Sequence, residues 1–169
     1  MSKLALAVAA LVASVATPAF ATSYTFNDVI NGAQETPVNA SLALATASGT
    51  YDDVTNVLTI SIVQTVPSVT LVNNAHIHTA APGVAGPVTI PLPGPFNVST
   101  SYNLAPTMFT LTAGQETNFL AGLHYVNIHT VTLPGGEIRG QLNPVVVPGP
   151  GVLPLLALGG LMALRRRRC

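Results

Sequence analysis

The chain has 169 residues, and its few charged side chains are unevenly placed. Five of its six basic residues stand at the two ends, so the middle holds all six acids with Arg139 as its single base, a net charge of −5. Nucleic-acid surfaces need a basic patch to neutralise phosphates, and anionic lipid is held by similar patches, so the composition argues against both kinds of partner. The length allows one domain with targeting segments.

The first 21 residues have the pattern of a secretory signal peptide. Lys3 gives a positive start, Leu4–Val15 is largely apolar, and Ala19 and Ala21 place small residues at a cleavage site. The apolar run is shorter than the ~20 residues that a membrane-spanning helix needs. We therefore expect residues 1–21 to form a signal helix that the secretion machinery recognises and that is removed after Ala21.

The C-terminal end has a second targeting pattern. Pro148 and Pro150 precede an apolar segment, Gly151–Leu164, and the segment is marginally short for a full membrane span. Four arginines follow it, namely Arg165, Arg166, Arg167 and Arg168. They would stay on the cytoplasmic side and stop transfer there. We expect residues 146–169 to be a tail whose apolar helix anchors the exported chain in the inner membrane, through a transient or retained contact.

Between these ends, residues 22–145 are predicted to form one domain without disulfides, since the single cysteine is Cys169. Short runs of β-branched and aromatic residues recur there and are separated by Gly, Pro, Asn and Asp, which is typical of antiparallel strands. The expected strands cover residues 24–30, 41–51, 57–63, 88–92, 108–111, 125–131 and 137–143.

One short helix is predicted in the second half of the domain. Thr112 is a fair N-cap, Gln115 stands where a capping-box partner belongs, and Gly122 suits the position just past the helix. Phe119 and Leu120 would face the sheet. Strands and helix together predict a mainly β fold, an antiparallel β-sandwich or open barrel with one short helix.

The four histidines lie in two places. His76 and His78 are two apart in an extended run, and alternation in a strand turns both imidazoles to one face. His124 and His129 belong to the last predicted hairpin, where the same alternation puts His124 toward the core and His129 on the opposite face. The functional candidates are therefore His76, His78 and His129.

The turn at 134–136 sets the register of this hairpin. A three-residue loop places the polar side chains of both strands on the face of His129, whereas an even-length loop would turn half of them to the core. We predict the first arrangement, because it leaves the apolar positions for the core. The polar set is then Tyr125, Asn127, His129, Glu137, Arg139 and Gln141.

Two interpretations of this face are open if the His76 strand borders the hairpin. In the first, His76, His78, His129 and Glu137 converge on a metal, since three imidazoles with a carboxylate suit zinc or copper. In the second, the histidines bond to their polar neighbours and Arg139 pairs with Glu137, which fixes the register without binding anything. The polar network of the second interpretation consists of Asn127, Arg139 and Gln141 with the same histidines and Glu137.

No catalytic site is predicted. The domain has no Gly-x-Ser-x-Gly elbow and no cysteine nucleophile, and its glycines are scattered in turns rather than gathered in a phosphate-binding loop ahead of a helix. We therefore expect a protein that is not an enzyme and that has no catalytic or cofactor-binding residues beyond the candidate metal site.

Several motifs of the middle part resemble the CHRD (chordin-type) domain. They are Asn-Gly-Ala-Gln-Glu-Thr-Pro at 31–37, Ala-His-Ile-His at 75–78 followed by Ala-Pro-Gly at 81–83, and the two segments of the closing hairpin at 125–130 and 134–142. The motifs appear in the expected order between residues 24 and 142. The resemblance implies a β-sandwich-like exported domain, and it carries over no enzymatic activity.

The tail is similar to PEP-CTERM sorting signals, which consist of a proline motif, an apolar segment and an arginine cluster. A membrane peptidase, the exosortase, recognises these signals, often in bacteria that make extracellular polysaccharide. Here Val-Pro-Gly-Pro at 147–150 takes the place of the proline motif, and Arg165–Arg168 form the cluster. The resemblance implies an exosortase-like sorting peptidase as a partner.

These patterns together predict an exported protein of the periplasm, cell surface or extracellular matrix that acts by binding or by structural presence. Its tail would sort it, and matrix polysaccharide is a candidate ligand. The alternative is a metal-binding or redox β-domain that uses the His-x-His strand at 76–78. That short motif is similar to a histidine pair in copper/zinc superoxide dismutases.

Overall fold

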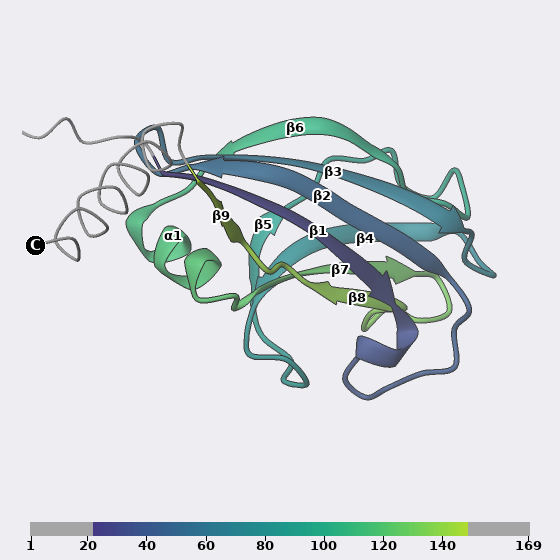
Figure 1. The fold of residues 1–169 in the computed structure, drawn as a ribbon. Coiled ribbons are helices and arrows are strands. Elements are labelled where there is room, and N and C mark those ends of the chain that lie inside the picture. The colour runs from purple at the N-terminus through teal and green to yellow at the C-terminus, as the bar shows by residue number, and fades with distance from the viewer. Residues whose placement is uncertain (1–21, 149–169) are drawn as a thin grey trace, which may run out of the picture.

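The computed structural model describes residues 22–148, which form one antiparallel sheet with a short α-helix beside it (Figure 1). The sheet has the strand order β5-β4-β7-β8-β1-β2-β3-β6, and β9 shares one edge of β1 with β8. It curls into a half-barrel, which confirms the predicted mainly β fold in its open form. The elements are β1 (Ser23–Asn31), the 3-10 helix η1 (Gly32–Gln34), β2 (Leu44–Asp52), β3 (Val57–Val66), β4 (Val72–Thr79), β5 (Val88–Pro91), β6 (Leu104–Thr110), α1 (Ala113–Leu120), β7 (His124–Thr130), β8 (Ile138–Gln141) and β9 (Val145–Val147).

The hairpin of β2 and β3 shows how the sheet acquires its apolar inner face. Leu58, Ile60 and Ile62 alternate with more exposed neighbours and are fully buried, as a period of two residues requires. In the turn before β3, the Asp52 carboxylate accepts hydrogen bonds from two backbone N–H groups. Asn56 then adopts a φ of 56°, a left-handed conformation that asparagine tolerates.

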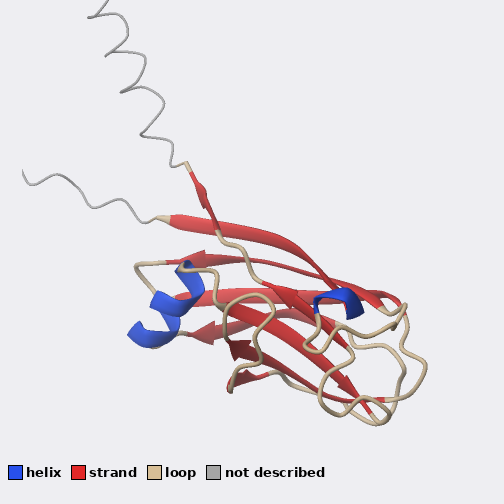
Figure 2. Ribbon diagram, turned by 90° about the horizontal axis from the view of Figure 1, so that it is seen from below, coloured by secondary structure: helices blue, strands red, loops and turns tan. Residues whose placement is uncertain are grey.

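Helix α1 begins and ends close to the predicted positions. The Thr112 hydroxyl accepts from the N–H of Gln115, and the Gln115 side chain accepts from the N–H of Thr112, so the predicted capping box is present. Gly122 follows the helix with a φ of 68°. Phe119 packs edge-on against aromatic rings of β1 and β2. The helix itself lies at one end of the sheet (Figure 2). The prediction for Leu120 was wrong, since this side chain is 37% exposed: neighbouring helical residues point about 100° apart, and only one can face the sheet.

Strands β7 and β8 are buried along their whole length on both faces. The inner face carries the core residues Val126, Ile128 and Ile138. The outer face carries polar residues, and two segments of irregular backbone fold over it, one between β4 and β5 and one between β1 and β2. These two covering segments define the position of the candidate site.

The sheet extends beyond the predicted end of the domain at residue 145. β9 runs to Val147 and pairs with Ser23–Thr25 at the start of β1. Within residues 22–148, no helix is both long and apolar enough to cross a bilayer.

Both predicted targeting segments lie outside the described residues, apart from the first three positions of the tail, 146–148. The signal peptide with Ala19 and Ala21 precedes residue 22. The rest of the tail follows residue 148 and contains Pro150, Arg165, Arg166, Arg167 and Arg168. The sorting and cleavage roles of these residues therefore stay predictions from the sequence.

His124 gives the fold a testable dependence on pH. The side chain is fully buried, as predicted, and neither ring nitrogen has a hydrogen-bond partner among the described residues. Burial lowers the pKa of His124 to about 4, from an ordinary value of 6.5. A histidine with a depressed folded-state pKa contributes stability that is complete above pH 6.5 and is lost as the pH falls toward 4.

We expect His124→Leu to keep the free energy of unfolding at pH 7 or to raise it, because two unpaired polar atoms leave the core. The loss of stability between pH 6.5 and 4 should shrink by roughly 3 kcal/mol, since the unfolded variant has one fewer histidine to protonate. Urea denaturation at a series of pH values measures both quantities. An unchanged slope with pH in the variant would contradict this assignment.

Candidate functional site

The polar face of the sheet is formed by β4, β7 and β8 in a fixed register. His76 lies opposite Asn127, which in turn lies opposite Arg139. One row further, His78 lies opposite Tyr125, and Tyr125 lies opposite Gln141. The His76 strand therefore borders the hairpin, which is the condition that both sequence-based interpretations required.

Three imidazoles meet on this face. One ring nitrogen each of His76, His78 and His129 can be chosen so that all three lie within 4.8 Å of one another. His76 Nδ1 and His129 Nε2 lie 3.1 Å apart and share a hydrogen bond. Two nitrogens that each bind a tetrahedral zinc ion at about 2.0–2.1 Å are about 3.3–3.4 Å apart, so this pair has nearly the spacing of two metal ligands.

Backbone carbonyls orient two of the three rings. His129 Nδ1 lies 3.0 Å from the carbonyl oxygen of Pro134, and His78 Nδ1 lies 3.0 Å from that of Gly86. A carbonyl oxygen only accepts, so each Nδ1 must carry the proton, and each Nε2 must carry the lone pair. His78 Nε2 is buried and has no hydrogen-bond partner within the described part of the chain.

The surroundings of His129 and His76 favour the uncharged imidazole. Burial lowers the pKa of His129 to about 4, with a smaller contribution from the neighbouring His76 and His78. Burial also lowers the pKa of His76, and the charge of His78 acts in the same direction. The neutral imidazole is the form that binds a metal ion.

Glu137, the fourth predicted ligand, does not join the three histidines. Glu137 lies just before β8, and its N–H donates to the carbonyl of Ile128, whose strand partner is Ile138. Glu137 is therefore outside the strand alternation that holds for Arg139 and Gln141. Its carboxylate instead accepts a hydrogen bond of 2.7 Å from the Ser41 hydroxyl.

Arg139 and Gln141 occupy the predicted face, but they hold a loop rather than Glu137. The Arg139 guanidinium donates to the carbonyls of Val84 and Ala81 and to the Gln141 side chain, and Gln141 donates to the carbonyl of Ala80. The predicted pairing of Arg139 with Glu137 is thus replaced by main-chain contacts. These contacts fix the segment that supplies the carbonyl of Gly86 to His78.

Arg139 and Gln141 together act as a clamp on the segment 80–84, and Tyr125 connects this clamp to the histidines. The guanidinium carbon of Arg139 lies 3.4 Å from the Tyr125 ring centroid, and the His78 ring stacks on Tyr125 at 5.1 Å and 18°. The Tyr125 hydroxyl accepts from the N–H of Gly86. His78 is therefore held by one ring and one carbonyl, both tied to the same clamp.

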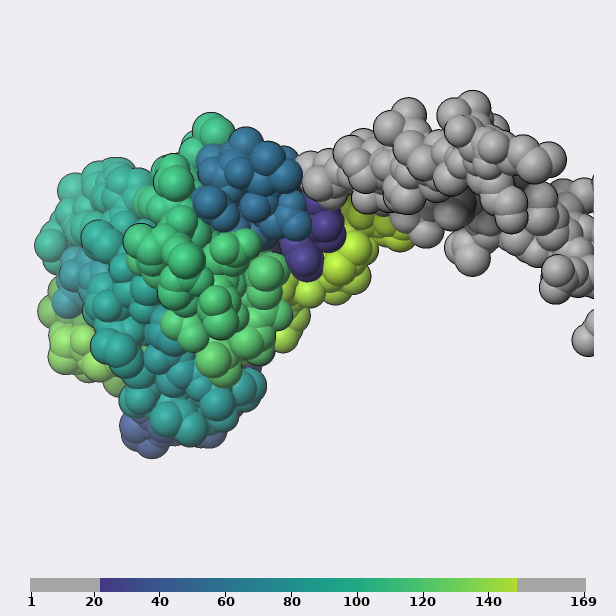
Figure 3. Space-filling model, turned by 90° about the vertical axis from the view of Figure 1, so that its left-hand side faces the viewer, coloured from purple at the N-terminus to yellow at the C-terminus, as the bar shows by residue number. Residues whose placement is uncertain are grey.

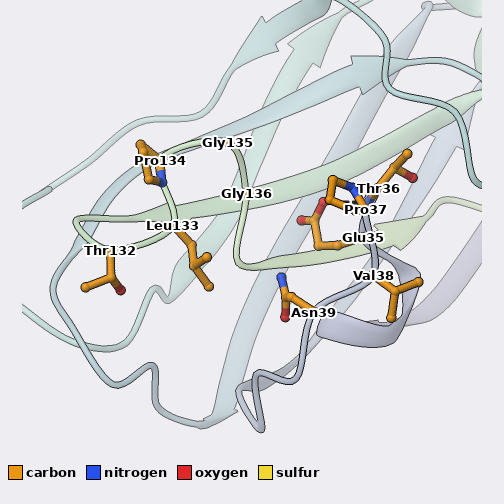
Figure 4. Close-up of a pocket in the computed structure, with 10 residues that line it drawn as sticks. All are labelled: Glu35, Thr36, Pro37, Val38, Asn39, Thr132, Leu133, Pro134, Gly135 and Gly136. Carbon is orange, nitrogen blue, oxygen red and sulfur yellow. Dashed lines mark hydrogen bonds between the residues drawn. The ribbon is translucent and has the colours of Figure 1, made fainter.

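Glu35 belongs to this region and was given no role from the sequence. Its side chain is 6% exposed, and burial raises the pKa of its carboxyl, partly offset by a hydrogen bond from Thr36 N–H, by the charge of Arg139 and by the nearby Asn127 amide. It lines a pocket of about 220 Å³ between segment 35–39 and the turn at 132–136 (Figure 4). The sequence feature that could have indicated a role for Glu35 was its place in the motif at 31–37, as an acid two residues before a proline.

The histidine cluster and the clamp lie within the part of the chain that matches a known domain family. The CHRD domain matches residues 26–142, which is more than half of the chain and includes the three histidines, Glu35 and Arg139. Comparisons with curated proteins and with solved structures give no match. On the domain match, the chain belongs to the CHRD domain family.

Proposed function

We propose that this chain is an exported cell-envelope protein whose CHRD domain acts by binding and not by catalysis. We further propose that His76, His78 and His129 bind a divalent transition metal, zinc or copper. The observation that carries the metal proposal is the convergence of three imidazole nitrogens within 4.8 Å. Nitrogen-rich sites of this kind suit these two ions.

The hydrogen bonds around the cluster support a metal over a closed polar network. A ligating histidine commonly donates its other N–H to a backbone carbonyl, which orients the ring. His78 and His129 both have this arrangement. A closed network would satisfy every buried ring nitrogen, whereas His78 Nε2 has no partner in the described chain and points to a missing one. Three protein ligands leave a fourth position for water or another ligand.

We expect the purified protein to bind one zinc or copper ion per chain. Binding at a hundredfold excess over Kd should raise the free energy of unfolding by about 2.7 kcal/mol, because only the folded state holds the three rings together. Elemental analysis and thermal unfolding with and without the metal measure the two effects.

The double variant His76→Ala/His78→Ala should lose both the bound metal and the thermal shift. His124→Leu is the matched control, since it removes a histidine that lies outside the cluster and should retain both. A wild-type protein that holds no transition metal, and whose melting temperature is insensitive to added metal, would contradict the metal proposal and leave a structural network as the role of these residues.

Export and sorting form the second part of the proposal. The signal-like residues 1–21 and the PEP-CTERM-like tail support delivery to the periplasm, the cell surface or the extracellular matrix. An exosortase-like peptidase is the expected partner at the tail. The lysine-free domain with its net charge of −5 is compatible with a place among matrix polysaccharides.

We expect deletion of Arg165–Arg168 to release the protein or to send it to a different fraction, because the positive block no longer stops transfer at the membrane. Replacement of the four arginines by lysines should keep the original distribution, since the charge is unchanged. Cell fractionation followed by immunoblotting gives the result. The same distribution for wild type and deletion would count against a sorting role.

A further inference from the structure

Beside the histidine cluster lies a second group of buried polar atoms without partners, and these atoms are oxygens. Glu35 Oε1, Asn127 Oδ1 and Glu137 Oε2 are all buried, and none has a hydrogen-bond partner among the residues that the structure describes. The three side chains are 6%, 4% and 2% exposed. An unpaired buried acceptor costs about 1–3 kcal/mol, so three in one region indicate a missing positive or donating partner.

Glu35 and Asn127 meet at Gly136. A Cβ atom at this position would lie 2.5 Å from Asn127 Oδ1, 2.6 Å from Asn127 Nδ2 and 2.7 Å from Glu35 Oε1, so the ends of both side chains face the same glycine. The Asn127 side chain also interacts with the Glu35 carboxyl and lowers its pKa, but neither Glu35 Oε1 nor Asn127 Oδ1 has a hydrogen-bond partner among the described residues. Gly136 also has a φ of 133°, which strains any other residue. Glu137 follows directly in the chain and brings a second buried carboxylate to the turn.

The pocket between segment 35–39 and the turn at 132–136 gives access to this group. Glu35 and Gly136 both line it, and Figure 4 shows the Glu35 carboxyl directed toward the loop that carries Gly136. The pocket holds about 220 Å³, which leaves space for an ion with several of its waters. Arg139 is the one basic residue that acts on Glu35, and its guanidinium is already engaged by carbonyls and Gln141.

We propose that Glu35 Oε1 and Asn127 Oδ1 bind a calcium ion that enters through this pocket. Calcium takes six to eight oxygen ligands from carboxylates, amide and main-chain carbonyls and waters, in flexible geometry. The hard oxygen atoms here differ in kind from the imidazole nitrogens of the neighbouring cluster, so the two sites select different ions. The calcium site would tie the segment between β1 and β2 to the turn between β7 and β8.

Calcium titration of the purified full-length protein tests this site. The chelated protein is compared at 10 mM calcium chloride and at the same ionic strength of sodium chloride, by calorimetry and by thermal unfolding at pH 7.5. We expect one calcium ion per chain with a Kd in the 10⁻⁴–10⁻³ M range of extracellular modules, and a rise in melting temperature of about 3–11 °C at 10 mM calcium.

Three variants test the roles of single ligand atoms. Glu35→Gln keeps the shape of the side chain and should abolish the calcium response, whereas Glu116→Gln, the same change on α1, should preserve it. Asn127→Asp adds a carboxylate oxygen at the same place and should tighten binding at least tenfold, since ligand charge sets calcium affinity. This gain keeps the proposal testable even if Glu35→Gln folds poorly.

The result that overturns the proposal is a wild-type protein with no calcium response, or an equal response in Glu35→Gln. If Glu35→Gln is more stable than wild type without calcium and wild type gives no response, a proton on Glu35 fills the role and the proposal fails. The site is independent of the transition-metal cluster: His76→Ala/His78→Ala should keep the calcium response, and Glu35→Gln should keep the zinc or copper response.

Discussion

The organisation of this domain depends on the complete burial of β7 and β8. A strand that is buried on both faces must find a partner for every polar side chain it carries, because water cannot supply one. On the inner face the core residues are apolar, but His124 also lies there, and its two ring nitrogens have no partner among the described residues. On the outer face this requirement is met by two covering segments whose main-chain carbonyls and side chains reach down to the strands. The histidine cluster and the oxygen group lie where these segments leave buried polar atoms without a hydrogen-bond partner among the described residues.

Arg139 illustrates how such a surface holds a charge. It is the single basic residue of the domain and is almost fully buried, and its planar group divides its hydrogen bonds among two carbonyls and one amide side chain. A lysine would have to reach both carbonyls from one nitrogen, whereas Arg139 uses two nitrogens in a fixed planar fork. The loop in turn presents Gly86 to His78, so the orientation of an imidazole depends on a guanidinium that never touches it.

Much of this arrangement follows from alternation alone. The extended run around His76 and the hairpin with His129 place three imidazoles on one face, and the strand pairing of the structure brings them together. Arg139 and Gln141 share the predicted face, but the three-residue loop was wrong: residues 131–137 connect β7 to β8, and Arg139 lies opposite Asn127. Glu137 departs from the pattern because it lies before β8 in the connection from β7, where the course of the chain depends on local hydrogen bonds that alternation does not describe. The covering segments could not be placed from the sequence, since their position is set by contacts with residues far away along the chain.

The pairing of β9 with the first residues of β1 has a geometric consequence. Ser23 lies opposite Val147, so the chain enters and leaves the domain at the same point, as the purple and yellow residues that touch in Figure 3 show. β1 then carries the chain about 26 Å to the far end, where η1 and the Glu35 pocket stand (Figure 1). If either terminus were attached to a surface, the Glu35 pocket would lie at the end of the domain farthest from that surface, where it is accessible to solutes.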